Sequence, residues 1–265
     1  MKVNCLGSVE VGVSTLHLLG KPLSEVVETL AETPVKYVEL VDEGLHALNK
    51  KRALKFKELG KSYGLRFSVH APFADINIAS PSRFMLRAVM KRLEKSIKLA
   101  SLLEANVWVF HPGLKTGISM FYPGAEWAQN RETAKALYRV ADDNGLQIAM
   151  ENVPEPYPFV MKSVEHFKKF YDEVNEDISL ALDVGHANIS GQIELFIKTF
   201  PNKIVHIHAH DNYGKEDEHL GVGRGIVDWG SFAKLLRQIA YNKAVVVESV
   251  EYVQESVERL RALLA

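Results

Sequence analysis

The feature that most constrains the fold is a regular alternation of short apolar, β-branched runs with longer helix-like segments. The apolar runs occupy residues 3–13, 35–41, 65–71, 106–112, 146–153, 178–185, 203–210 and 243–250. The helix-like segments are 22–32, 47–63, 82–104, 126–144, 163–174, 190–199, 229–240 and 251–264. Strand–helix alternation predicts parallel strands joined by right-handed crossovers. Eight such units predict an α/β fold, a single (β/α)8 TIM barrel.

Local signals support these elements. Within 82–104, apolar residues recur on one helical face at Leu86, Val89, Met90, Leu93, Ile97 and Leu102. Gly64 and Gly145 stand just before strands, where left-handed helix caps are expected. Ser163 and Asp228 are expected to begin helices.

The alternative fold is an open, doubly wound sheet. That fold expects a G-x-G-x-x-G turn after its first strand, and VGVSTLHLLGK does not contain one. The chain shows no linker, low-complexity stretch or basic tail that would divide it. We therefore expect one domain over residues 1–265.

Composition limits the class of protein. Hydrophobic residues make up 47% of the chain and charged residues 25%, which is typical of soluble globular proteins. The net charge of −1 gives no global positive field for nucleic acid, although a local basic groove is compatible with it. The single cysteine, Cys5, excludes an intrachain disulfide and a cysteine zinc cage. The N-terminus does not resemble a signal peptide, and no apolar run reaches 18 residues, so we expect a cytoplasmic protein without membrane spans.

Histidines and carboxylates follow six consecutive predicted strands. In chain order these residues are His70, His111, Glu151, Asp183 with His186, His208 with Asp217 and His219 in the following loop, and Glu248. The C-terminal ends of barrel strands meet at one mouth, where barrel enzymes place their chemistry. Imidazole and carboxylate groups together bind divalent zinc, manganese, iron or cobalt. The segment HIHAHDNYGKEDEH (206–219) therefore indicates part of a polynuclear metal site.

Each of these residues also has a structural interpretation. A strand-end carboxylate often caps the next helix. His206 and His210 share the strand face of His208, so they are expected to be packing residues or hydrogen-bond partners of ligands. Asp42 and Glu43 indicate a solvated turn. Six consecutive strand ends with ligand residues favour the metal site over separate structural roles.

The same residues lie in a recognisable series of motifs. The motifs HAPF, HPG, EN, D-x-x-H, H-x-x-D, D-x-H and G-x-G-x-x-D-W, with a final glutamate on the eighth strand, resemble the xylose isomerase-like barrel superfamily. This superfamily joins sugar phosphate isomerases and epimerases to endonuclease IV, of AP endonuclease family 2. The resemblance covers the third to the eighth strand.

The resemblance implies two possible ligand sets. In the isomerase and epimerase branch, one metal ion is held by residues that match Glu151, Asp183, His208 and Glu248. In the endonuclease IV branch, three zinc ions are held by nine residues, which match these four and His70, His111, His186, Asp217 and His219. The cofactor implied is zinc or manganese, with one to three ions.

Some positions depart from endonuclease IV. Phe73 stands at the tyrosine position of its H-x-x-Y motif, with different spacing after it, and the D-T-C-H motif is D-V-G-H at 183–186. The loop after the seventh strand is shortened and reads NYGKE. These departures weaken the prediction of DNA repair and leave the ligands unchanged.

The favoured function is a metal-dependent isomerase or epimerase of a small keto-sugar or sugar phosphate. The metal would polarise the carbonyl and stabilise an enediolate. The resemblance implies that Glu151 and Glu248 transfer protons on opposite sides of the sugar. Arg224, in the glycine-rich loop GVGRG, is a candidate substrate ligand or a solvated arginine. Apolar cavity walls are expected from Phe73, Phe121, Tyr122, Trp127 and Trp229.

The alternative is a zinc-dependent AP endonuclease, which would cleave phosphodiesters at abasic DNA sites. Such an enzyme must grip phosphates with Lys and Arg near the mouth. The loops offer Arg83, Lys115, Arg131, Lys215 and Arg224 without a cluster. Nucleic acid is therefore the less favoured partner. A barrel that binds metal without catalysis is the third interpretation.

Overall fold

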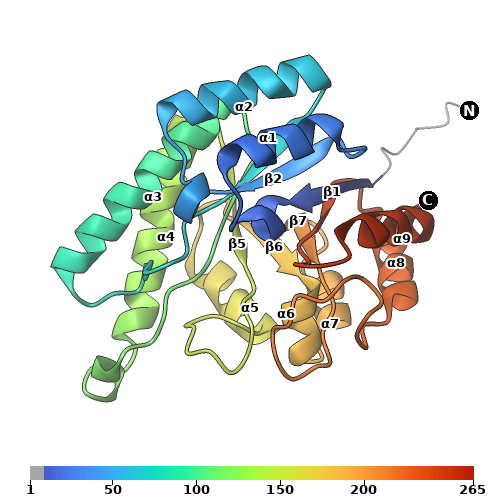
Figure 1. Cartoon of the computed structure of the whole chain (residues 1–265). Coiled ribbons are helices and arrows are strands. Elements are labelled where there is room, and N and C mark those ends of the chain that lie inside the picture. Colours follow the sequence, from blue (N-terminus) through green and yellow to red (C-terminus); the bar gives the residue numbers. More distant parts are fainter. Residues whose placement is uncertain (1–8) are drawn as a thin grey trace, which may run out of the picture.

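Eight short parallel strands close into a barrel in the order β1 to β8, with β1 paired to β8 (Figure 1). The structure is a computed structural model that describes residues 9–265. The strands are β1 (Glu10–Ser14), β2 (Tyr37–Val41), β3 (Arg66–His70), β4 (Val107–Phe110), β5 (Gln147–Glu151), β6 (Ser179–Asp183), β7 (Ile204–Ala209) and β8 (Ala244–Val247). The predicted (β/α)8 barrel is confirmed. Part of the first predicted run, residues 3–8, lies outside the described residues.

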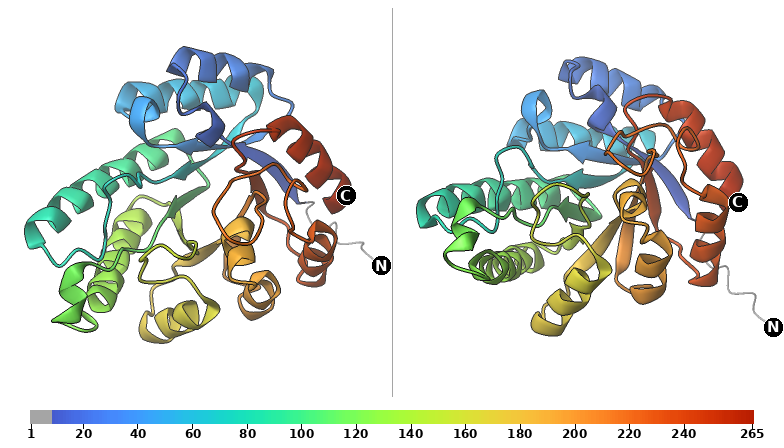
Figure 2. Two further views of the ribbon diagram at one scale, coloured as in Figure 1. Left: turned by 60° about the horizontal axis from the view of Figure 1, so that its bottom comes forward. Right: turned by 90° about the horizontal axis from the view of Figure 1, so that it is seen from below.

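Helices surround the strands (Figure 2). They are α1 (Leu23–Glu32), α2 (Lys50–Tyr63), α3 (Arg83–Leu103), α4 (Ala125–Asp143), α5 (Val164–Glu173), α6 (Val184–Ile189), α7 (Ile193–Thr199), α8 (Trp229–Gln238) and α9 (Val253–Leu264). The sequence did not indicate α6, which begins directly after β6, nor the 3-10 turns η1 (Thr15–Leu18), η2 (Gly44–His46) and η3 (Gly117–Met120).

The predicted helix ends are confirmed. Gly64 caps α2 with a φ of 66°, and Gly145, after α4, has a φ of 64°. Both lie in the left-handed region that glycine adopts without a steric penalty. The side chains of Ser163 and Asp228 accept hydrogen bonds from the first turns of α5 and α8.

The period-two alternation of the strands separates two apolar regions. Ile148 and Met150 of β5 pack in the large core between the strands and the helices. Ala149 belongs to a small cluster inside the barrel, with Val107, Val109, Ala181 and Val205. Glu151 is on the same face of β5 as Ala149, two residues further along. The alternation therefore directs Glu151 into the barrel at the C-terminal end of its strand.

An irregularity in β7 changes which residues point inward. The pairing of β6 with β7 shifts between Leu180, which pairs with Ile204, and Ala181, which pairs with His206. An extra residue on one strand of a pair re-aims the side chains that follow it. As a result, Val205 joins the inner cluster, and His206 and His208 contact Glu39 of β2 inside the barrel.

The prediction of a solvated turn after the second strand is wrong for Asp42. Its side chain is buried, and it accepts hydrogen bonds from both terminal nitrogens of Arg92, at 3.0 and 2.9 Å, and from the Leu48 amide at 2.6 Å. Glu43 accepts hydrogen bonds from the Phe73 and Ala74 amides at 3.0 Å. These contacts tie the loop after β2 to α3 and to the loop after β3.

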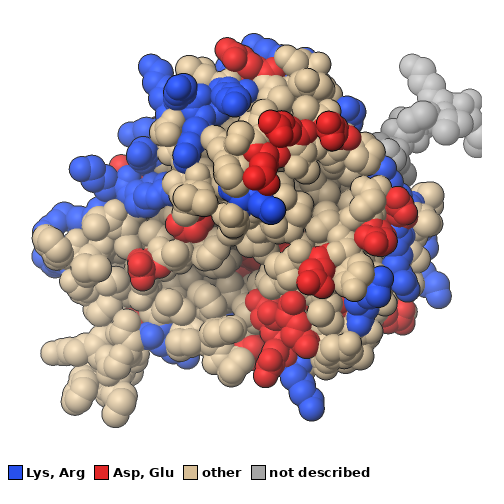
Figure 3. Space-filling view, in the orientation of Figure 1, with Lys and Arg blue, Asp and Glu red and all other residues tan. Residues whose placement is uncertain are grey.

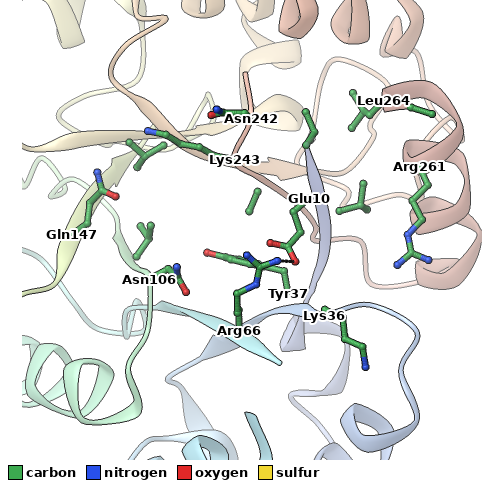
Figure 4. Close-up of a pocket in the computed structure, with 16 residues that line it drawn as sticks. Glu10, Lys36, Tyr37, Arg66, Asn106, Gln147, Asn242, Lys243, Arg261 and Leu264 are labelled. Carbon is green, nitrogen blue, oxygen red and sulfur yellow. Dashed lines mark hydrogen bonds and ion pairs between the residues drawn. The ribbon is translucent and has the colours of Figure 1, made fainter. Parts of the chain in front are cut away.

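The N-terminal ends of the strands border a pocket of about 750 Å³ (Figure 4). Lys36, Arg66, Lys243 and Arg261 line it, and Arg66 pairs with Glu10. The candidate ligands of the sequence analysis are not among its lining residues. Among residues 9–265, no helix is both long enough and apolar enough to cross a membrane.

The aromatic packing of α5 gives a test of the core. Phe167 is fully buried, and its ring lies 5.7 Å from that of Phe196 and 6.4 Å from that of Phe200. Replacing Phe167 by Ala should reduce the free energy of unfolding by about 3–5 kcal/mol, because it leaves a cavity. Phe84→Ala, at a side chain that is 72% exposed, should change it by less than about 0.5 kcal/mol. Denaturant unfolding measures both values, and similar losses would contradict this description of the core.

Candidate metal centre at the mouth of the barrel

All nine predicted ligands meet at the C-terminal mouth in three groups, two of which share a residue. One group is Glu151, Asp183, His208 and Glu248, a second is His70, His111 and Glu151, and a third is His186, His210, Asp217 and His219. Within each group, one ligand atom of every residue lies within 4.8 Å of those of the others. Glu151 belongs to the first two groups and joins them.

Glu151 makes the closest set of contacts. Its Oε2 lies 3.1 Å from Nε2 of His111 and 3.3 Å from Nε2 of His70, while Oε1 lies 3.0 Å from Nδ1 of His208. Two ligands of one tetrahedral ion with bonds of about 2.0 Å are separated by about 3.3 Å. The side chains are therefore spaced as ligands of shared cations would be.

Three of the histidines are held by backbone carbonyls through their Nδ1 atoms. The pairs are His70 with Ala71 O at 2.9 Å, His186 with Asn152 O at 2.8 Å and His219 with Glu248 O at 2.8 Å. A carbonyl only accepts, so each Nδ1 carries a hydrogen. The Nε2 atoms of His186 and His219 then face Asp217 Oδ2 at 3.2 and 3.4 Å. This tautomer leaves the Nε2 lone pair available to a metal ion.

The carboxylates make the site strongly attractive to positive charge. Burial disfavours the histidine cations, but the Glu151 carboxylate raises the pKa of His70 to about 9, and Asp183 and Asp217 raise the pKa of His186 to about 10. Although burial alone would raise it, the neighbouring histidines hold the pKa of Glu151 well below its usual range. Burial and the charge of Glu151 raise the pKa of Glu248. A divalent cation can replace these protons.

His210 explains the glycine of the D-V-G-H motif. Nε2 of His210 lies 3.1 Å from both carboxylate oxygens of Asp183, and its ring stacks on that of His219 at 3.9 Å. A Cβ at Gly185 would overlap the His210 ring. The predicted role of His210, as a packing or hydrogen-bonding partner of ligands, matches these contacts.

Asn152 holds the main chain of Asp183 in place. Its side chain donates to Asp183 O at 3.0 Å and accepts from Asp183 N at 2.7 Å, which joins the ends of β5 and β6. In the sequence, Asn152 is evident only as part of the EN motif. Glu39 was missed, and the available signal was a charged residue on an otherwise apolar, buried strand.

Asp211 organises the glycine-rich loop that follows β7. Its buried carboxylate accepts hydrogen bonds from the Trp229 indole at 2.9 Å and from the Gly223 and Val227 amides at 2.9 and 3.1 Å. Arg224, in the same loop, is exposed and lies over the Tyr252 ring at 3.8 Å. It does not line the cavity at the mouth. Its assignment as a substrate ligand stays a prediction.

A cavity of about 620 Å³ opens beside the ligands. His70, His111, Glu151, His186, Asp217, His219 and Glu248 form its polar side. Of the five aromatic walls predicted, only Phe73 lines it, because Phe121 and Tyr122 are exposed and Trp229 is buried in the core. Tyr157 and Phe159, together with aliphatic residues, supply the apolar wall instead. The prediction of the other four residues as walls is therefore wrong.

Comparison with known proteins identifies the family. The family model described as xylose isomerase-like TIM barrel matches residues 27–263. The chain therefore belongs to this family. Its fold is that of sugar 3-epimerases: a solved D-tagatose 3-epimerase-like protein is 28% identical, with a TM-score of 0.87 over 97% of this chain and 100% of that chain.

Two relatives were also found by sequence similarity. An uncharacterized protein of Methanocaldococcus jannaschii is 30% identical over 90% of this chain and 83% of its own length. A probable endonuclease 4 of Halothermothrix orenii is 25% identical over 69% of this chain and 71% of its own length. The family is thus established, and the activity must be argued from the site.

Gly185 gives a test of the packing around His210. Gly185→Ala should lower the free energy of unfolding by about 1–3 kcal/mol, because the His210 ring has to move. In a His210→Ala background the same substitution should have little effect, since the ring is absent. Denaturant unfolding of the four proteins measures this coupling. An equal loss in both backgrounds would show that His210 is not what excludes a side chain at residue 185.

Proposed function

We propose that the protein is a metal-dependent isomerase or epimerase of a small keto-sugar. The observation that carries the proposal is the pair of buried glutamates, Glu151 and Glu248, at the wall of the cavity at the mouth. Both lie within 3.2 Å of His208 Nδ1, at 3.0 and 3.2 Å. The sugar 3-epimerase-like fold supports the same class of reaction.

The donor set fits a divalent metal ion. Glu151, Asp183, His208 and Glu248 would hold it, with oxygen and imidazole ligands suited to manganese or zinc. When bound, such an ion would polarise a substrate carbonyl and stabilise the negative charge that develops on its oxygen. Further ions at His70 and His111, and at His186, Asp217 and His219, belong to the same proposal.

The two glutamates are suited to opposite proton transfers. Removing a proton beside a carbonyl needs a base, and returning one to the other face needs an acid. Neighbouring histidines hold the pKa of Glu151 below its usual range, whereas burial and the charge of Glu151 raise the pKa of Glu248. Different environments that separate the pKa values of two carboxyls are typical of acid–base pairs.

The cavity favours an uncharged sugar over a phosphorylated one. In the part of the chain that the structure describes, its lining includes neither lysine nor arginine. A phosphate is usually held by such cations or by helix N-termini. The apolar wall, which includes Phe73 and Phe159, suits the carbon face of a small sugar. Figure 3 shows basic side chains gathered mainly over α2 and α3 on the face it displays.

An AP endonuclease is the second candidate. It is favoured by one observation, which is the presence of all nine residues that match the ligands of the endonuclease IV branch. The absence of cations among the described cavity-lining residues counts against it, because a nuclease must bind phosphates near its metals.

Loss of the acid–base pair is the direct test of activity. Glu248→Gln should reduce epimerisation or isomerisation of ketoses by about 100-fold or more, because the amide cannot transfer the proton. Glu216→Gln, on the exposed loop after β7, is the matched control and should retain activity. The assay offers metal-loaded protein a panel of ketoses and a DNA duplex with one abasic site. Metal-dependent nicking of the duplex, with every sugar unchanged, would reverse the order of the two candidates.

The amount of bound metal tests the proposed metal centre independently of catalytic activity. Glu151→Gln preserves size but removes the charge shared by two ligand groups, so elemental analysis should show a fall in bound metal per chain. Glu126→Gln, at a buried carboxylate that accepts hydrogen bonds from Thr116 and Ser119, is the control. Unchanged metal in Glu151→Gln would assign Glu151 to catalysis or structure instead.

A further inference from the structure

A fully buried glutamate lies behind His208, on a strand that supplies none of the nine predicted ligands. Glu39 of β2 has an exposed fraction of 0%. Its Oε1 lies 2.9 Å from Nε2 of His208, and its Oε2 lies 2.8 Å from Nε2 of His206. Oε2 also accepts a hydrogen bond from the Ser68 hydroxyl at 3.1 Å. Oε1 of Glu39 and Nε2 of His208 lie at ion-pair distance without hydrogen-bond geometry. A buried carboxylate is costly when one oxygen has only such a contact.

The opposite side of the His208 ring faces the metal-ligand carboxylates. Nδ1 lies 3.0 Å from Glu151, 3.2 Å from Glu248 and 3.8 Å from Asp183. A neutral imidazole carries a hydrogen on one nitrogen and a lone pair on the other. Nδ1 is hydrogen-bonded to Glu151 at 3.0 Å. If a cation took the place of that hydrogen, the ring hydrogen would remain on Nε2, where the Glu39 carboxylate, which only accepts, lies 2.9 Å away.

This arrangement is the reverse of that of the other anchored histidines. His70, His186 and His219 direct Nδ1 to a neutral backbone carbonyl and leave Nε2 for the ion. His208 instead directs Nε2 to a charged group. A carboxylate partner raises the electron-donating power of a metal-ligand imidazole and fixes its orientation.

We infer that Glu39 is a positioning residue that makes His208 an Nδ1 ligand of the metal ion. The inference rests on the proposed metal centre and assigns to β2 a part in it. Ser68 and His206 restrain the carboxylate from the other side. The shift in the β7 pairing contributes, because it brings His206 inward beside His208.

A separate ion between Glu39, His206 and His208 is the competing interpretation, since their ligand atoms also lie within 4.8 Å of one another. The number of carboxylates decides between them. His208 Nδ1 faces three acidic residues and Nε2 faces one, so a divalent cation is better neutralised on the Nδ1 side.

Zinc affinity of Glu39→Gln tests the assignment. Competition with a chromophoric chelator should show one Zn²⁺ equivalent bound about 10–100-fold more weakly than in the wild type. Glu126→Gln, also a buried glutamate but without a histidine contact among its hydrogen bonds, should bind Zn²⁺ as the wild type does. Equal affinity of Glu39→Gln and the wild type overturns the inference. If neither binds Zn²⁺, the proposed metal centre fails as well; if both bind it equally, only the role of Glu39 fails.

A measurement on the wild type covers the case in which Glu39→Gln does not fold. Nitrogen-15 NMR of histidine-labelled, Zn²⁺-loaded protein distinguishes protonated from metal-bound ring nitrogens. His208 should show a hydrogen on Nε2 and zinc on Nδ1, and His70 and His186 should not show this pattern. Zinc on Nε2 of His208, or a hydrogen on its Nδ1, overturns the inference, and a structural role for Glu39 alone would not produce the expected pattern.

Discussion

The concentration of buried negative charge around Glu151 is the constraint on which the mouth of the barrel depends. Glu39, Glu151, Asp183 and Glu248 are all nearly inaccessible to solvent. Ionised carboxylates cannot be buried together without compensating positive charge or hydrogen-bond donors. The histidines supply that compensation in the protein alone, and divalent ions supply it more effectively. The same requirement explains why imidazoles are so dense after β7.

Much of the fold, and the meeting of the predicted ligands at one mouth, could be predicted from the sequence, because both follow from short-range periodicity. Alternating apolar runs and helical segments define the barrel, and barrel geometry brings strand ends together. Glu151 and Asp183 needed no three-dimensional information beyond that rule. What each residue contacts at the mouth, such as His111 beside Glu151, depends on the register of strands that are distant in sequence.

The predictions that were wrong or missing have a related physical cause, which is contact between residues distant in sequence. Asp42 looked solvated because its partner, Arg92, is 50 residues away in the chain. The cavity walls were wrong because aromatic residues in loops give no indication of whether they turn inward. Glu39 was overlooked because a single charge in an apolar strand is informative only when its partners are known. The alternation of residues in HIHAH gives no indication that the pairing of β7 with β6 shifts.

The nine predicted ligand residues also divide the barrel unequally. They come from β3 to β8 and the segments that follow these strands, while β1 and β2 contribute none. Bound cations would cross-link the six strands from β3 to β8. They would not cross-link β1 to its two neighbours, β2 and β8. Local opening of the barrel would then concentrate at β1, and amide hydrogen exchange would remain fastest there even in the loaded protein. Glu39 is a buried charge that extends the network across this boundary, from β7 to β2.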